Sequence, residues 1–258
     1  ILPNEGYGPY EALNPRQIWQ LVVLISGLSF LGYWLTKLRG DHGVVLTGIV
    51  GGLASSTAAT LSIARLVREG VAAPRAGAAG IVAANVVMLA RVGALLFVIS
   101  REALAVTWPA LLAAFVAGLV VAILFWRGKK SAPVSVALGN PMELKPALFF
   151  AGLLAFISVA SRFATDRFGE GGLYAVAAVT GLADVDALTL TAGDQAARGA
   201  IGAPTAGAAI LIAVAANIFL KGAMAWAVAG TAAGARIAAA FVVVIAAGAG
   251  AYVVLGMN

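Results

Sequence analysis

The feature that most constrains this chain is a series of eight apolar runs, each close to the length of a membrane-spanning helix. They cover residues 18–38, 44–66, 76–99, 104–126, 147–164, 172–192, 205–230 and 237–255. A helix needs about 20 predominantly apolar residues to cross the hydrocarbon core of a bilayer. Only 11% of the residues are charged, against roughly 25% in soluble domains. We therefore predict an all-α fold, a polytopic transmembrane helical bundle of about eight segments that lies in a lipid bilayer.

Several other classes of protein are excluded by what the sequence contains. The net charge of +6 comes from basic residues that lie mainly between the apolar runs, where they act as topology signals rather than as a nucleic-acid surface. Cysteine is absent, and the one histidine, His42, is expected in a short solvated loop. The sequence has no P-loop, GxGxxG or HExxH motif. We expect no enzymatic activity, no nucleic-acid partner and no cofactor, apart from a cation that the protein could bind.

The two halves of the chain repeat each other. GLASSTAATL at 52–61 matches GLADVDALTL at 181–190 with an offset of 129 and six identities in ten positions. APRAGAA at 73–79 matches APTAGAA at 203–209 with an offset of 130, and Asn14-Pro15 matches Asn140-Pro141. We predict a first membrane repeat at 1–126, a basic cytoplasmic connection at 127–145 and a second membrane repeat at 146–258. Asn followed by Pro is typical of a helix start.

Two topologies are compatible with the charges. If all eight segments span, the repeats are parallel and the side of the termini carries nine Lys and Arg residues against six. If the Gly-rich second and sixth segments are broken and re-entrant, the repeats are inverted and the split is ten to five, with the termini outside. Both topologies place the RGKK connection in the cytoplasm by the positive-inside rule.

Four charged residues fall inside the predicted spans, namely Arg91, Lys221, Asp184 and Asp186. Each would cost about 2.5–3.5 kcal/mol at the centre of a bilayer if it faced lipid. They are therefore expected to face the protein interior. One interpretation is structural, with two buried ion pairs that register the repeats. The other, which we favour, is that they belong to a functional site, with Arg91 and Lys221 balancing charge.

The matched motifs give the candidate ion-binding residues. These are Ser55, Ser56, Thr57 and Thr60 in the first repeat, and Asp184, Asp186 and Thr189 in the second. Hydroxyl and carboxylate oxygens suit hard cations, so Asp184 and Asp186 are also candidate metal ligands. The neighbouring glycines either unwind the helix or pack it closely, as in Gly48-x-x-x-Gly52. Asn85 and Asn217 are secondary polar candidates, for which an interhelical hydrogen bond is the simpler interpretation.

The strings GVVLTGIVGGLASSTAATLSIARLVREG, TGLADVDALTL and ANIFLKGAMA resemble the membrane region that follows an MgtC/SapB-type domain in bacterial proteins. The resemblance implies a multi-pass protein of the bacterial inner membrane, and an MgtC-type part that would precede Ile1. It implies a link to magnesium limitation but no catalytic residue.

We therefore expect a transporter or channel for a small inorganic ion, with a cation (Mg²⁺, Na⁺ or H⁺-coupled) favoured. The alternative is a non-transporting membrane protein that binds and regulates a lipid or protein partner. The Gly-rich surfaces are also compatible with a homodimer.

Overall fold

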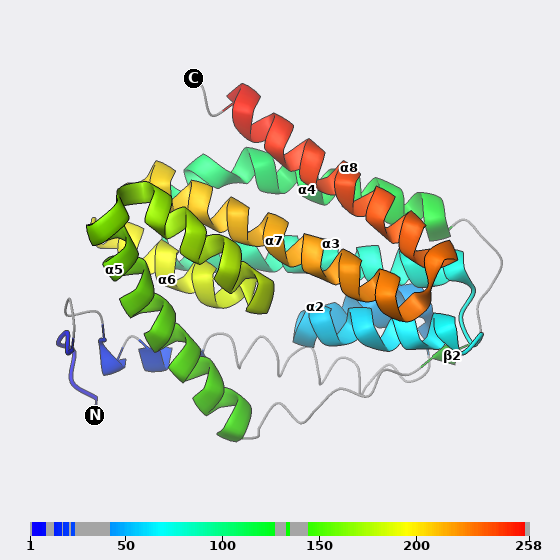
Figure 1. Cartoon of the computed structure of the whole chain (residues 1–258), viewed down its shortest axis with the longest axis horizontal. Coiled ribbons are helices and arrows are strands. Elements are labelled where there is room, and N and C mark those ends of the chain that lie inside the picture. The colour runs from blue at the N-terminus through cyan, green and yellow to red at the C-terminus, as the bar shows by residue number, and fades with distance from the viewer. Residues whose placement is uncertain are drawn as a thin grey trace. The chain divides into compact units, whose positions relative to one another are not determined.

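The computed structural model describes residues 2–8, 13–16, 18–20, 22–23, 42–126, 133–134 and 144–255. Within these residues, helices α2 to α8 make up nearly all of the regular structure (Figure 1). Five of the described helices are long and apolar enough to cross a membrane: α2, α3, α4, α7 and α8. The predicted all-α membrane bundle is confirmed. Most of the first predicted segment, 18–38, lies outside the described residues.

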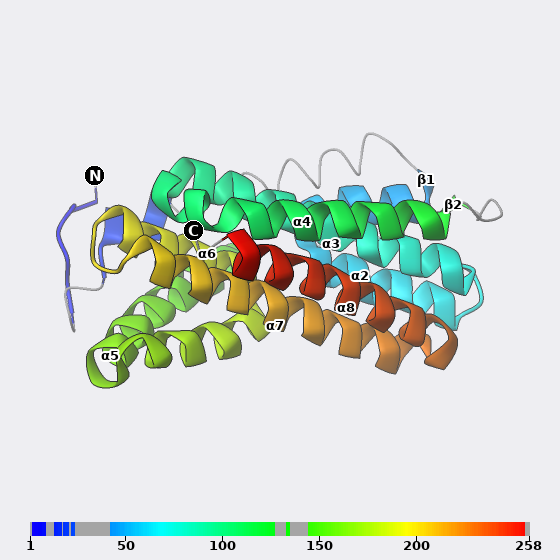
Figure 2. The same cartoon turned by 90° about the horizontal axis from the view of Figure 1, so that it is seen from above.

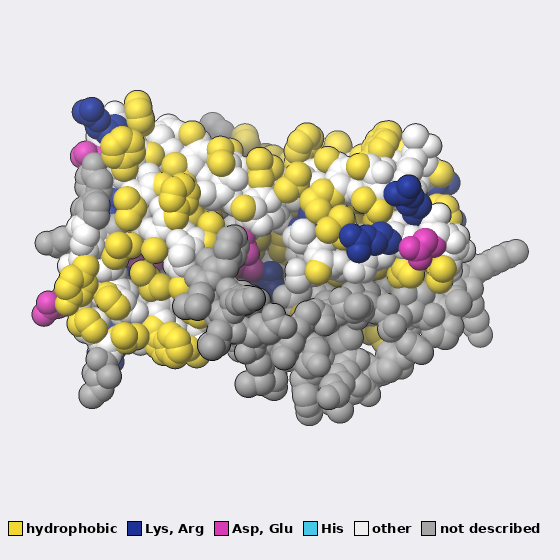
Figure 3. Space-filling view, turned by 60° about the horizontal axis from the view of Figure 1, so that its bottom comes forward, with side chains coloured by type: hydrophobic (Ala, Val, Ile, Leu, Met, Phe, Trp, Pro, Cys, Tyr) yellow, Lys and Arg dark blue, Asp and Glu magenta, His cyan; other side chains and the backbone are white. Residues whose placement is uncertain are grey.

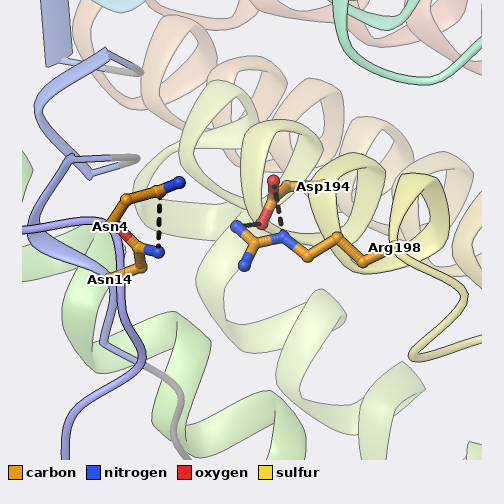
Figure 4. Close-up of polar contacts among 4 residues, drawn as sticks. All are labelled: Asn4, Asn14, Asp194 and Arg198. Atoms are coloured by element: carbon orange, nitrogen blue, oxygen red, sulfur yellow. Dashed lines mark hydrogen bonds and ion pairs between the residues drawn. The ribbon is translucent and has the colours of Figure 1, made fainter.

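Most helices follow the predicted segments and differ from them only at their ends. They are α3 (Pro74–Ile99), α4 (Arg101–Trp126), α7 (Ala203–Ala229) and α8 (Thr231–Leu255). The predicted helix start at Asn14-Pro15 is also present, because the Ile18 N–H donates to the Asn14 carbonyl over 3.0 Å. The Asn14 side-chain amide donates to Asn4 Oδ1 over 3.2 Å (Figure 4). The matching pair Asn140-Pro141 lies outside the described residues.

Helix α2 (Val44–Arg68) is a helical hairpin, not a straight rod. Its backbone is extended at Ser55, with φ −161° and ψ 105°. A Cβ placed on Gly51 would lie 3.2 Å from the Cβ of Ala59, although eight residues of straight helix would separate them by about 12 Å. The arms 44–54 and 56–68 therefore fold back on each other, and we call this segment the α2 hairpin. The re-entrant alternative for the second segment describes it better than a single crossing does.

Small residues let the α2 hairpin pack closely on α3. A Cβ on Gly48 would lie 2.0 Å from the Gly80 carbonyl oxygen, and one on Gly52 would lie 2.9 Å from the Ala84 Cα. Gly80 itself contacts both Val44 and Ile63, which come from opposite arms. The predicted role of the GxxxG motif in helix packing is confirmed, and it coexists with the chain break at Ser55.

The sixth predicted segment is divided between two helices. Helix α5 (Leu144–Ala183) contains a sharp reversal at Gly169, with φ 62° and ψ −152°, and α6 (Val185–Ala197) begins after a second break at Asp184. Gly169 adopts a conformation that residues with a side chain avoid. Helix α6 packs against α5 and runs back beside its second arm, 170–183 (Figures 1 and 2). We call this arm together with α6 the α5–α6 hairpin.

The two hairpins end in the same way. After α2, the Val71 N–H donates to the Leu66 carbonyl over 3.0 Å, and after α6 the Ala200 N–H donates to the Gln195 carbonyl over 2.8 Å. In each case a left-handed glycine precedes the donor: Gly70 with φ 75° and Gly199 with φ 69°. This is the Schellman type of helix end. The equivalent residues are 129 positions apart, the offset found between the sequence motifs.

A short strand pair replaces the loop that was expected at His42. Strand β1 (His42–Gly43) pairs antiparallel with β2 (Pro133–Val134), with His42 opposite Val134. The pairing brings part of the connection 127–145 to the start of α2. The RGKK string and most of this connection lie outside the described residues.

The described chain divides into two compact units. Unit 1 comprises Ile1–Gly27, Val92–Thr107 and Pro141–Asn217, and unit 2 comprises Leu28–Arg91, Trp108–Asn140 and Ile218–Asn258. Each unit contains one hairpin, the α5–α6 hairpin in unit 1 and the α2 hairpin in unit 2. The repeat boundaries at 126 and 146 stay a prediction.

The exposed surface is strongly apolar, as a lipid-facing surface must be. Along α4, the side chains at every fourth position are about half exposed: Trp108, Leu112, Val116, Val120 and Leu124. Figure 3 shows hydrophobic side chains spread over the drawn surface instead of gathered in one patch. On a soluble protein such an exposed apolar stripe would favour aggregation, whereas in a bilayer it would face hydrocarbon.

Candidate functional site

The tip of the α2 hairpin carries the candidate hydroxyls of the first repeat. Ser55 Oγ accepts a hydrogen bond from the Ala58 N–H over 3.2 Å and so caps the second arm. The next residue, Ser56, is buried, and its carbonyl accepts from the fully buried Thr60 hydroxyl over 2.8 Å. Thr57 is half-buried. The tip therefore combines a polar turn with a buried polar first helical turn.

The tip of the α5–α6 hairpin has the same design with an acid in the capping position. The Asp184 backbone is extended, with φ −157° and ψ 117°, and its Oδ1 accepts from the N–H groups of Asp186 and Ala187 over 2.8 and 3.0 Å. Asp186 is 3% exposed and lies in the first turn of α6. The buried Thr189 hydroxyl donates to the Val185 carbonyl over 2.8 Å. Two carboxylates are thus placed at a helix N-terminus, where the helix dipole favours negative charge.

The two tips correspond residue by residue at the offset of 129. Ser55 and Asp184 share the extended backbone and the capping of the residue three positions ahead. Thr60 and Thr189 share the hydroxyl bond to the carbonyl four residues back. What differs is the charge, since the first tip is neutral and the second is acidic. The asymmetry predicted from the exchange of Ser-Ser-Thr for Asp-Val-Asp is present in the structure of the tips.

Lys221 of α7 contacts the tip of the α2 hairpin, although the two segments lie 165 positions apart in the sequence. Its side chain is 1% exposed, and its Nζ donates to Ser56 Oγ over 2.7 Å, to Asn85 Oδ1 over 3.4 Å and to Met88 Sδ over 3.0 Å. Asn85 in turn donates to the Ile81 carbonyl within α3. The structure thus brings together three predicted site residues, Lys221, Ser56 and Asn85, and a fourth residue, Met88, that was not predicted. A thioether within an apolar run looks like ordinary core packing.

Two other candidates bind backbone groups that the helix breaks set free. Arg91 Nη1 donates to the Leu53 carbonyl over 3.1 Å, two residues before the break at Ser55. Asn217 Nδ2 donates to the Gly181 carbonyl over 2.8 Å, three residues before the break at Asp184. In a continuous helix these carbonyls would accept from an N–H four residues ahead. Each hairpin therefore has a side chain from a neighbouring long helix that replaces a lost donor.

The ion pairs between the acids and the bases, which belong to the structural interpretation of the four charges, stay a prediction. Asp184 and Asp186 belong to unit 1, whereas Arg91 and Lys221 belong to unit 2. Among the described residues, no group of three or more His, Asp or Glu side chains could hold a metal ion. Asp184 and Asp186 as metal ligands likewise stay a prediction, and the capping role of Asp184 already occupies one of its oxygens.

The sequence is similar to one protein family and to a bacterial relative. Residues 23–229 match the family described as "Domain of unknown function (DUF4010)". A relative from Aquifex aeolicus (strain VF5), described as an uncharacterized protein, is 31% identical over 188 residues. The match covers 72% of this chain and 82% of the relative. No solved structure matches. The relation to MgtC/SapB-type proteins stays an expectation.

Proposed function

This chain belongs to the DUF4010 family, and we propose that it is a transporter or channel for a small inorganic ion in the bacterial inner membrane. The observation that carries this proposal is the pair of helical hairpins, each broken at the position where the candidate site residues lie. Broken helices at matching positions of two repeats are typical of transport sites. Non-helical backbone at membrane depth is tolerated where it is buried in protein or lines a water-filled cavity.

The chemistry of the tips favours a cation. The α5–α6 tip has the buried carboxylate of Asp186 and the hydroxyl of Thr189, and the α2 tip has the hydroxyls of Ser56 and Thr57. The arm that precedes each break also ends in carbonyl groups without a helical N–H donor four residues ahead, the negative end of a helix dipole. Carboxylate, hydroxyl and carbonyl oxygens are the ligands of Na⁺ and Mg²⁺, and a carboxylate can instead carry a proton.

The test is ion flux in proteoliposomes that contain the purified chain, measured under gradients of Na⁺, Mg²⁺ and H⁺. Asp186→Asn removes a buried charge at nearly constant size, so we expect flux to fall at least tenfold. Asp184→Asn should lower it less, because Asn also caps helices well. Asp166→Asn, which removes an exposed acid of α5, is the matched control and should transport normally.

Two results would count against the proposal in different ways. Unchanged flux in both Asp184→Asn and Asp186→Asn would show that the assigned residues do not bind the transported ion, although the protein transports one. Absence of flux for every cation in the unmodified protein would favour the second candidate, a non-transporting protein that binds and regulates a lipid or protein partner. The observation that favours this second candidate is the capping by Asp184, which uses its carboxylate structurally.

A further inference from the structure

Lys221 of α7 is the largest of the fully buried side chains among the described residues. Burial takes an ammonium group out of water, which is costly unless other acceptors replace the water. The acceptors here are Ser56 Oγ at 2.7 Å, Asn85 Oδ1 at 3.4 Å and Met88 Sδ at 3.0 Å from Nζ. All four residues belong to unit 2. We call the lysine and these three acceptors the Lys221 cluster.

The geometry around Nζ fits a protonated amine. An ammonium group has three N–H donors and no acceptor, and a thioether sulfur can only accept. The amide of Asn85 is oriented by its own hydrogen bond, since Nδ2 donates to the Ile81 carbonyl over 3.0 Å and Oδ1 faces Lys221. A neutral amine has only two N–H groups and would turn its lone pair toward an acceptor. The cluster is therefore arranged to hold a positive charge.

The acceptors also indicate which kind of cation suits the α2 tip. Hydroxyl and amide oxygens bind free metal cations as well as ammonium groups. The thioether of Met88 is a poor ligand for Na⁺ or Mg²⁺, because hard ions prefer oxygen. It does accept a hydrogen bond from an N–H donor. The tip therefore suits an ammonium group better than a metal ion.

The two hairpin tips differ in the way that a tethered and a free cation would require. A tethered ion has a high effective concentration at its site, so neutral acceptors can hold it. A free ion has to be drawn from water, for which a carboxylate is more effective. At the offset of 129, Ser56 corresponds to Val185 and Thr57 to Asp186. The tip bound by Lys221 is thus neutral, and the other tip carries the acid.

We propose that the Lys221 ammonium is a built-in cation that occupies the cation site of the α2 tip. The site recognises a primary ammonium group through Ser56, Asn85 and Met88. A free ion then binds only at the acidic tip of the α5–α6 hairpin. This last consequence rests on the proposed function, whereas the occupation of the α2 tip by an ammonium group can be measured without transport.

Lys221→Ala allows a direct test, because it removes from the side chain the equivalent of one propylammonium ion. Propylammonium chloride added to the purified variant should fill the vacated space and donate to the same acceptors. The comparison ligands are 1-propanol, which is similar in size but uncharged, and NaCl at the same concentration. Lys221→Met is the matched control, since its uncharged side chain fills most of the space. The measurement is thermal unfolding in detergent.

We expect about 50 mM propylammonium chloride to raise the Tm of Lys221→Ala by about 3 °C or more. The same concentrations of 1-propanol and NaCl should raise it by less than about 1 °C. Lys221→Met should respond to none of the three. Equal shifts with propylammonium and 1-propanol would overturn the proposal, because the charge would then have no role. A variant that does not respond to propylammonium would overturn it as well.

A second pair of variants tests the proposal if Lys221→Ala does not fold. Ser56→Ala removes the acceptor closest to Nζ and leaves a buried N–H group unpaired. We expect it to lower the Tm by about 4 °C or more in the unmodified chain, and by less than about 1 °C in Lys221→Met. Equal losses in the two backgrounds would overturn the proposal.

The outcomes for the tip and for transport are separable. Stabilisation of Lys221→Ala by propylammonium, together with no cation flux in the unmodified protein, would retain the built-in cation and reject the proposed function. Cation flux in the unmodified protein, together with no response of Lys221→Ala to propylammonium, would retain the proposed function and reject the built-in cation.

Discussion

Asp184 has a structural role as the cap of α6 and a proposed functional role as a charged residue of the tip. Its carboxylate holds two backbone N–H groups at the start of α6 and also supplies negative charge to the tip. In the first repeat the capping is left to Ser55, which carries no charge. Capping alone therefore does not require an acid at this position, and the charge of Asp184 is available for a second purpose.

The two purposes of Asp184 can be separated by a pair of substitutions. Asp184→Ala removes the cap and should lower the free energy of unfolding by about 1 kcal/mol, whereas Asp184→Asn should retain most of it. The measurement is thermal unfolding of the detergent-solubilised protein. Equal losses of stability in both variants would mean that the charge, and not the cap, stabilises the tip.

At the scale of elements, the contact between the α2 hairpin and α3 depends on the absence of side chains. Gly48 meets the Gly80 backbone so closely that a methyl group has no room, and the atom it would meet is a carbonyl oxygen that cannot turn aside. Both arms of the hairpin touch the same glycine of α3. The tip residues are therefore positioned by a close backbone contact that begins two turns away from them.

We expect Gly48→Ala to destabilise the protein by about 1–3 kcal/mol, the usual cost of overpacking a well-packed interior. Gly93→Ala is the matched control, since a Cβ there meets nothing within 4 Å. The control should be neutral, or stabilising by up to about 1 kcal/mol, because alanine favours helix. The measurement is thermal unfolding of both variants. If Gly48→Ala and Gly93→Ala were equally stable, close packing at Gly48 would be refuted.

Some elements could be predicted from the sequence, and others could not. The apolar runs and the prolines at helix starts are local signals, so the bounds of α3, α4 and α7 were predictable to within a turn. The glycines around Ser55 and Asp184 pointed to interrupted helices. The reversal at Gly169 falls in the connection between the fifth and sixth predicted segments, so its place could be predicted. The backbone conformation of Gly169 could not, because several glycines lie close together there and the sequence does not reveal which of them has a positive φ. The partners of Lys221 and Asn217 depend on packing between distant segments, which no local pattern encodes.

At the scale of the whole molecule, the hairpins favour the inverted one of the two topologies left open by the charges. A hairpin that returns to the side it entered adds no crossing. If 18–38 spans the bilayer, as the sequence predicts, each repeat would cross it three times. An odd number of crossings inverts the second repeat relative to the first. For this topology we expect the side that carries the connection 127–145 to be cytoplasmic, with ten Lys and Arg residues including those of the connection, and both termini to lie outside.

The turns at the ends of the hairpins test this topology. Glu69→Cys and Ala200→Cys place single thiols on exposed residues after α2 and after α6. With inverted repeats we expect Glu69→Cys to react only from the cytoplasmic side and Ala200→Cys only from the outside. A membrane-impermeant maleimide applied to intact spheroplasts and to inverted vesicles measures the side. Labelling of both thiols from the same side would support eight full crossings and parallel repeats.

The contact between Lys221 and Ser56 also has a consequence for how the protein is made. The two residues are 165 positions apart, so a ribosome delivers the α2 hairpin to the membrane long before the lysine that binds its tip exists. Both arms can pack on α3 at Gly80 as soon as α3 has been synthesised. Ser56 at the tip can bind Lys221 only after α7 has been synthesised. The first half of the nascent chain therefore enters the bilayer with a polar turn that its own residues only partly satisfy, and synthesis of the second half completes it.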